Sequence, residues 1–126
     1  MIIRIDTTSA VPVYAQIVQQ VKRAIAVGAL KPGDSIDSLR ETAAKLRVNP
    51  LTVSKAYKLL EQDGLLESKQ GLGSFVASNV AIPTEEFKRD CVSAGLDMVF
   101  SDASHLGMNG QELRNLIEER LGRYGY

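Results

Sequence analysis

The sequence predicts a mainly α-helical protein with one small β-hairpin. A winged helix-turn-helix is expected over residues 1–77, a linker over 78–83 and a short two-helix dimerisation segment over 84–126. Three observations predict this architecture. Two helix starts with strong capping residues follow each other closely. After these helices, the spacing of apolar residues changes from the helical period to the alternation of short strands. Beyond the linker, the spacing returns to the helical period.

The first helix is expected to open within residues 9–12 and to end at Gly28, a residue that commonly follows the last turn of a helix. Six apolar residues follow the helical period between them: Tyr14, Ile17, Val18, Val21, Ala24 and Ile25. Before this helix, the alternating stretch 2–5 can form a short extended arm on the core. After it, Pro32-Gly33 suits a type II turn, because glycine tolerates the positive φ that this turn requires.

Residues 38–64 carry the clearest local signals, those of two short helices joined by a tight turn. Ser38 can cap the first helix, with Glu41 in the capping-box position three residues later. Asn49 is a strong N-cap for the second helix, and Pro50 stands where its missing N–H costs nothing. A buried stripe is expected along the second helix, formed by Val53, Ala56, Tyr57 and Leu60.

The opposite face of this second helix is short, polar and basic. It carries Leu51, Thr52, Ser54, Lys55 and Lys58. These residues lie toward the helix N-terminus, the end that a helix-turn-helix protein directs at base edges. The same pattern is also typical of an ordinary helical hairpin with a solvated basic face, so the flanking segments must decide between the two interpretations.

A glycine-rich loop at residues 70–73 separates two short strand candidates, 65–69 and 74–77. Directly after a helix pair, such a hairpin favours the wing of a winged helix. Lys69 and the glycine backbone of the loop can approach a sugar-phosphate chain closely, because glycine has no Cβ to obstruct the approach. The alternative is a plain hairpin that covers one edge of the core.

Beyond the linker, a helix is expected to open at Thr84, a loop to follow over 101–108 and a last helix to be capped by Asn109. Candidate dimerisation residues are Phe87, Cys91, Val92, Leu96 and Val99 on the first of these helices and Leu113, Leu116 and Ile117 on the last. Two short helices bury little apolar surface on their own. They either fold back on the winged helix or pack against a second chain, and the wide apolar face of 87–100 favours a homodimer.

Composition bounds the class of protein. The 15 Lys+Arg balance the 15 Asp+Glu, but residues 1–77 contain ten basic and seven acidic residues, whereas residues 78–126 contain five and eight. A mildly basic first part fits contact with phosphates. The single cysteine, Cys91, fits a reducing cytoplasm, and no apolar run approaches the ~18 residues of a membrane span.

Catalysis is not expected from this sequence. The sole histidine, His105, has no sequence partner that would indicate a catalytic triad. The sole cysteine lies on an apolar stripe, which is typical of a buried structural thiol. The sequence shows no phosphate-binding loop and no metal-ligand spacing, so neither a metal nor another cofactor is expected.

Motifs spread over residues 11–77 together resemble the GntR family of bacterial transcription regulators. They are PVY at 12–14, QI at 16–17, GALKPGD at 28–34, SLRE at 38–41, VNPLTVSKAY at 48–57, LE at 60–61, GL at 64–65 and GLGSFV at 71–76. The NPxTVxKAY string and the short C-terminal segment look most like the YtrA-type subfamily, which has a minimal dimerisation region in place of a large ligand domain. The resemblance implies a sequence-specific repressor that binds an inverted-repeat operator as a homodimer, often one that controls an ABC-transporter operon.

The DNA contacts of the family carry over onto the residues that match its motifs. These are Ser38, Arg40, Asn49, Leu51, Thr52, Ser54 and Lys55 at the helix pair, and Lys69, Gln70 and Gly71 at the wing tip, which enters the minor groove in relatives. Arg40 matches an arginine that contacts phosphate or base. Leu51 replaces a more usual polar residue and either touches a thymine methyl or only fills space. Asp37 stands where the family usually has proline, which places a carboxylate near the expected phosphates.

One alternative function remains open, that of a winged helix that docks proteins and does not bind DNA. Such a module has no need to keep Arg40, Thr52, Lys55 and a basic glycine-rich wing together, so double-stranded DNA is the expected partner. The sequence leaves open whether a small-molecule effector also binds.

Overall fold

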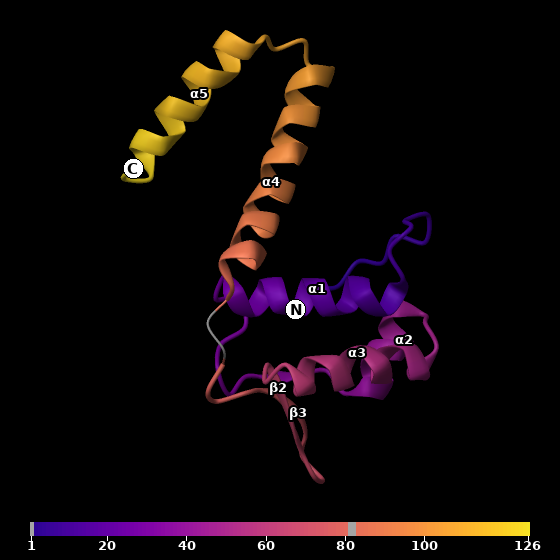
Figure 1. Cartoon of the computed structure of the whole chain (residues 1–126). Coiled ribbons are helices and arrows are strands. Elements are labelled where there is room, and N and C mark those ends of the chain that lie inside the picture. The colour runs from indigo at the N-terminus through magenta and orange to yellow at the C-terminus, as the bar shows by residue number, and fades with distance from the viewer. Residues whose placement is uncertain (1, 81–82) are drawn as a thin grey trace. The chain divides into compact units, whose positions relative to one another are not determined.

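The computed structural model describes residues 2–80 and 83–126, in two units, Met1–Pro83 and Thr84–Tyr126 (Figure 1). The first unit contains α1 (Val13–Ala26), β1 (Ser35–Ile36), α2 (Leu39–Leu46), α3 (Pro50–Gln62), β2 (Leu66–Lys69) and β3 (Gly73–Val76). The second contains α4 (Glu85–His105) and α5 (Gly110–Arg123). The predicted fold class is confirmed: a winged helix followed by two C-terminal helices. Of the expected linker 78–83, residues 81–82 lie outside the described part of the chain.

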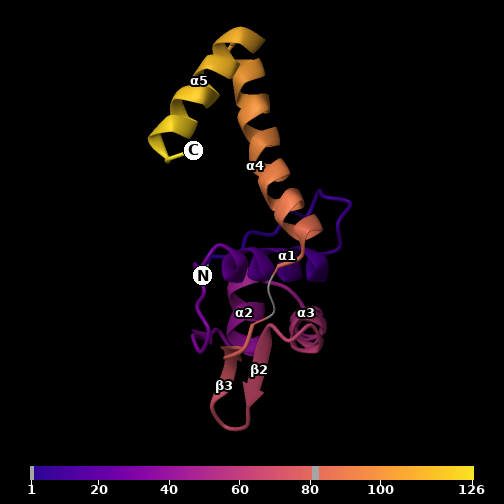
Figure 2. The ribbon, with the colours of Figure 1, turned by 60° about the vertical axis from the view of Figure 1, so that its left-hand side comes forward.

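The sheet of the first unit is antiparallel, with strand order β1-β3-β2. The expected hairpin is present: β2 and β3 pair with Leu66 opposite Val76 and Lys69 opposite Gly73 (Figure 2). The sequence did not reveal β1, whose residues Ser35 and Ile36 pair with Phe75 and Ser74. A two-residue strand has no period of its own, so its pairing with a distant segment cannot be predicted from local pattern.

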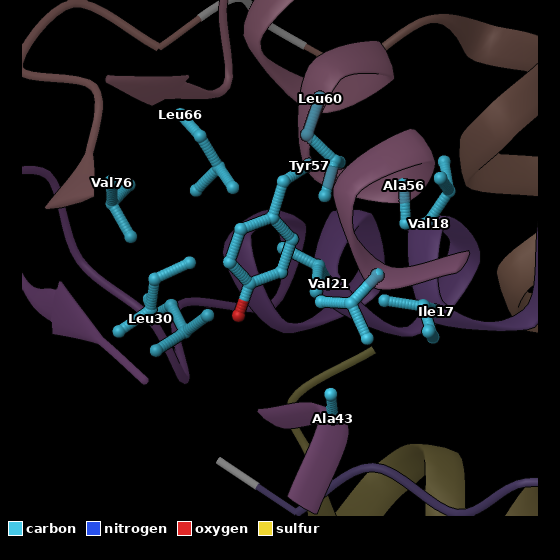
Figure 3. Close-up of a cluster of buried hydrophobic side chains, with 12 residues drawn as sticks. Ile17, Val18, Val21, Leu30, Ala43, Ala56, Tyr57, Leu60, Leu66 and Val76 are labelled. Carbon is cyan, nitrogen blue, oxygen red and sulfur yellow. The ribbon is translucent and has the colours of Figure 1, made fainter. Parts of the chain in front are cut away.

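The core of the first unit lies between α1, α3 and the sheet. Figure 3 shows side chains of α1 meeting those of α3, with Leu66 and Val76 from the sheet beside them. Five of these side chains are fully shielded from solvent: Ile17, Val21, Val53, Leu60 and Val76. All the residues predicted for the α3 stripe are buried, which confirms the helical period that was assigned to that segment.

Side-chain hydrogen bonds cap the N-terminal ends of the two helices of the helix-turn-helix, as the sequence predicts. The Ser38 hydroxyl accepts a hydrogen bond from the Glu41 backbone N–H at 3.1 Å, and the Asn49 side chain accepts one from the Leu51 N–H at 2.9 Å. Between them, Arg47 lies in the left-handed region with φ 55°. Such side-chain caps satisfy donors that the first turn of a helix leaves unpaired.

The N-terminal arm is held on α1 by two glutamine side chains, in addition to the packing of Ile3 and Ile5 against the core. The Gln20 amide accepts from the Arg4 N–H at 2.9 Å and donates to the Arg4 carbonyl at 2.7 Å. The Gln16 amide forms the same pair of bonds with Asp6, at 2.8 and 2.9 Å. The backbone N–H and C=O groups of the predicted arm are therefore bonded to glutamine side-chain amides, in the way that a β-strand bonds to the backbone of its neighbour.

In the second unit, Thr84 and Asn109 cap α4 and α5 as expected, through bonds to the N–H groups of Phe87 and Glu112. The expected loop over 101–108 was wrong at its start, because α4 continues to His105. Neither glycine nor proline interrupts residues 101–106, and the chain turns only near Gly107, which has φ 73°. The only buried side chain in this unit, among its described residues, is Ala103.

Candidate nucleic-acid interface

A buried pair of hydroxyl groups fixes α3 against α2. The phenol of Tyr57, 3% exposed, donates to the Asp37 backbone carbonyl at 2.7 Å and lies 2.8 Å from the Thr42 hydroxyl. Since the phenol has only one proton, which it donates to Asp37, Thr42 must donate to Tyr57. Burial raises the pKa of the Tyr57 phenol above its usual value of 10.0. These bonds hold the start of α2 and the middle of α3 in one arrangement.

The outward face of α3 forms a shallow hollow of about 340 Å³. It is lined by Leu51, Ser54, Lys55, Lys58, Leu59 and Gln62. Leu51 is the most exposed apolar residue of the helix, at 76%. The sequence placed Lys58 on this face but did not extend the candidate surface to Leu59 and Gln62, although both recur at helical spacing. Thr52 is half-buried and does not line the hollow.

Lys55 makes a contact that the sequence did not reveal. Its ammonium lies 3.9 Å from the centroid of the Tyr14 ring, near the start of α1. An ammonium over an aromatic face at an exposed site is stabilised by about 0.5–1 kcal/mol. This contact links the outward face of α3 to the start of α1. Tyr14 lies in the PVY motif at 12–14 and Lys55 in the VNPLTVSKAY motif at 48–57. Membership of these motifs is the one sequence signal that could have indicated a contact between the two residues.

The start of α2 combines an exposed arginine with an ion pair. Arg40 is exposed in the first turn, and the Ser38 oxygen is engaged in capping. The Asp37 carboxylate lies 2.8 Å from the Lys45 ammonium. Its hydrogen bond raises the pKa of Lys45 above the usual 10.5. Asp37, which stands where the family usually has proline, therefore has its carboxylate paired with the ammonium of Lys45 in the same unit.

The wing presents glycine backbone and one lysine. Gly71 and Gly73 have φ values of 77° and 106°, in the left-handed region that glycine adopts without strain. The Lys69 ammonium lies 4.8 Å from the centroid of the Phe75 ring, and Gln70 is exposed beside it. Leu72, at the tip, is 72% exposed and was not among the predicted site residues. All ten predicted DNA-contact residues lie in the first unit.

The predicted dimerisation residues lie on α4 and α5, with side chains only partly covered. Val92, Leu96, Val99 and Leu116 are exposed by 63, 41, 44 and 41%, whereas Phe87, Cys91, Leu113 and Ile117 are half-buried. Met98 and Phe100 add to the exposed apolar surface of α4, at 71 and 44%. The two helices diverge from their connection (Figures 1 and 2). No helix in the described ranges 2–80 and 83–126 is long and apolar enough to cross a membrane.

Three packed helices, a capped turn between α2 and α3 and a glycine-tipped hairpin together define a winged helix-turn-helix of the DNA-binding class. Residues 13–76 match the family model described as bacterial regulatory proteins, gntR family. The chain belongs to this GntR family. It is therefore a DNA-binding transcription regulator and not an enzyme, as the sequence indicated.

Relatives extend the similarity beyond the winged helix. The transcriptional repressor YtrA of Bacillus subtilis (strain 168) is 38% identical over 117 residues, which are 93% of this chain and 90% of the relative. The solved structure of YtrA from Sulfolobus acidocaldarius, a GntR-family transcription factor, is 33% identical with a TM-score of 0.56, over 98% of this chain and all of that one. The DNA-binding domain of AraR, solved in complex with operator ORX1, is 33% identical with a TM-score of 0.53, over 59% of this chain and 92% of that one.

Proposed function

We propose that this protein is a repressor that binds an inverted-repeat operator as a homodimer in the cytoplasm and controls an operon of the ABC-transporter type. The observation that carries the proposal is a basic hollow on α3 whose lining contains no carboxylate, with an exposed arginine and a glycine-tipped wing in the same unit. Similarity to the YtrA repressor over 93% of the chain supports repression. The operon class follows from the YtrA-type resemblance of the sequence. No effector forms part of the proposal.

The proposed DNA contacts divide by chemistry. Arg40 and Lys69 suit phosphates, since Arg40 is an exposed cation in the first turn of α2 and Lys69 is an exposed cation at the end of β2, next to the wing loop. The α3 surface with Leu51, Thr52, Ser54 and Lys55 faces bases. Asn49 uses its side-chain oxygen as a cap, so only its amide N–H groups remain for DNA. The other proposed contacts are Ser38, Gln70 and Gly71.

We further propose that residues 1–77 form the DNA-binding domain, that residues 78–83 form a linker and that residues 84–126 form the dimerisation segment. A dimer that persists at ~1 µM needs an association free energy of about 8 kcal/mol. A fully buried large apolar side chain supplies about 1.5–3 kcal/mol, so about three to five of them are needed, before the cost of association. Val92, Leu96, Val99 and Leu116 are exposed and apolar on α4 and α5, which supports this segment as the interface.

Selection of bound sequences from a random duplex library tests the proposal. We expect an inverted repeat, because two-fold symmetric dimers bind half-sites related by the same axis. Arg40→Ala should lower the affinity for the selected duplex by about 1–3 kcal/mol. Lys88→Ala, which removes an exposed cation from α4, is the matched control and should leave the affinity nearly unchanged. A wild-type logo without symmetry would contradict the dimeric operator.

The alternative is a winged helix that docks proteins and does not bind DNA. A salt series on the selected duplex separates the two functions. A DNA-binding protein loses affinity steadily as salt rises, because it displaces counterions from phosphates. Failure to enrich any sequence, together with no salt-dependent shift of a duplex, would contradict the proposed function and favour protein docking.

A further inference from the structure

Leu51 stands out on the proposed DNA surface because it is apolar and 76% exposed, on a backbone that a capping hydrogen bond holds. It lies in the first turn of α3, directly after Pro50. Its backbone N–H is held by the Asn49 side chain at 2.9 Å, so the Cα–Cβ direction is set by a capped helix start. A single exposed leucine is ordinary on a protein surface. This one occupies the N-terminal part of a recognition helix, the part that helix-turn-helix proteins direct at base edges.

The surroundings of Leu51 limit what it can contact. The hollow that it shares with Ser54, Lys55 and Lys58 carries two cations, and none of the described residues lining it is acidic. Two lysines in the same hollow suit an approach to DNA, where phosphates flank the major groove. Leucine has neither donor nor acceptor, so it cannot read the hydrogen-bonding pattern of a base edge. The only apolar group that the major groove displays is the C5-methyl group of thymine.

We propose that Leu51 is a specificity-determining residue that selects thymine at one position of each half-site through contact with its C5-methyl group. The inference rests on the proposed function, since it needs α3 in the major groove. Leu59, further along the hollow, is half-buried and two turns from the helix start, so it is less available to a base. Leu72, at 72%, is nearly as exposed but lies on the wing, whose expected partner is the minor groove, where thymine presents no methyl group.

The expected effect follows from removing a single methyl group. Deoxyuridine pairs like thymidine and differs only in lacking the C5-methyl. Replacing the critical thymidine in one half-site should weaken binding about fourfold, which corresponds to ~0.8 kcal/mol per buried methylene-sized group. Replacing it in both half-sites should weaken binding about fifteenfold, since distant contacts add. Leu51→Ala should bind thymidine and deoxyuridine duplexes equally.

The experiment takes the full chain and the duplex that wild-type protein selects, and exchanges each thymidine in turn for deoxyuridine. Leu51→Ala is compared with Leu72→Ala as a matched control, because both remove an exposed leucine and neither touches the core. We expect one thymidine position at which wild-type and Leu72→Ala are sensitive to the exchange and Leu51→Ala is not. Circular dichroism of each variant checks that its helices are retained.

Further probes separate the outcomes. With cytidine at the critical position, 5-methylation of that cytosine should recover part of the affinity of wild-type protein and none of that of Leu51→Ala. Wild-type binding that no deoxyuridine exchange affects would overturn the inference and leave the proposed function standing. Equal sensitivity of wild-type and Leu51→Ala at every thymidine would overturn it too. Absence of duplex binding by wild-type protein would instead overturn the proposed function.

Discussion

Replacing Tyr57 by phenylalanine tests whether the buried hydroxyl pair holds the helix-turn-helix together. The change removes one oxygen and leaves the ring in place, so the apolar packing around α3 is kept. It also leaves two groups without a partner: the Asp37 carbonyl, which accepts from the phenol at 2.7 Å, and the Thr42 hydroxyl, 2.8 Å away. Thr42 is 4% exposed, so water cannot easily replace the missing bond at that end.

The magnitude follows from the two partners that are left behind. A buried polar group without its hydrogen bond costs about 1–3 kcal/mol. Asp37 is only half-buried, so its carbonyl can relax toward water and most of the cost falls on Thr42. We expect Tyr57→Phe to lower the free energy of unfolding by ~2 kcal/mol. Because 1 kcal/mol shifts the Tm of a 60–100-residue domain by about 4–8 °C, the first unit should melt roughly 8–16 °C lower.

Urea and thermal unfolding of the full chain, followed by circular dichroism, measure this loss. Thr42→Val is the matched variant, and it should cost less, because the phenol still donates to Asp37. The double variant should cost less than the sum of the two, since valine removes the hydroxyl that phenylalanine would leave unpaired. Tyr57→Phe within ~0.5 kcal/mol of wild type, or strict additivity in the double variant, would refute this account of the hydroxyl pair.

Three further predictions concern pH, salt and assembly. The raised pKa of the Tyr57 phenol contributes stability that is present below pH ~10 and is lost as pH rises through the folded-state value; alkaline titration of Tyr57→Phe should therefore show a shallower decline. Lys69→Ala should make the slope of log affinity against log salt shallower by about one per half-site, because one phosphate contact is lost there. A change in base preference with an unchanged slope would contradict the proposal that Lys69 positions the wing on phosphates. Leu96→Asp should give monomers with an intact first unit in sedimentation, whereas unchanged dimers would exclude Leu96 from the interface.

Much of the fold could be predicted because its signals are local. Ser38, Asn49 and Asn109 each cap a helix within three residues of their own position. The apolar period of α3 identified its buried face without any knowledge of what packs there. The end of α4 was predicted too early, because the polar residues at 101–105 resemble a loop, although neither glycine nor proline occurs between residues 96 and 106.

The parts that could not be predicted depend on contacts between distant residues. The pairing of β1 with β3 joins residues about 40 positions apart, a separation at which local pattern has no influence. The stacking of Lys55 on Tyr14 likewise links α3 to α1. For the candidate site, residue types, helix faces and the capping role of Asn49 could be predicted, but not that Lys55 would already have a partner in Tyr14.

The ion pair between Asp37 and Lys45 couples the charges of two positions that lie eight residues apart in the sequence. Replacing Asp37 alone by the proline usual in the family would leave Lys45 without its carboxylate and make the surface one charge more positive. Replacing Lys45 alone by a neutral residue would change the charge by one in the other direction. Only a joint replacement preserves the local charge, so chimeras of related regulators should keep residues 37–45 from one parent, and natural sequences would be expected to change these positions together.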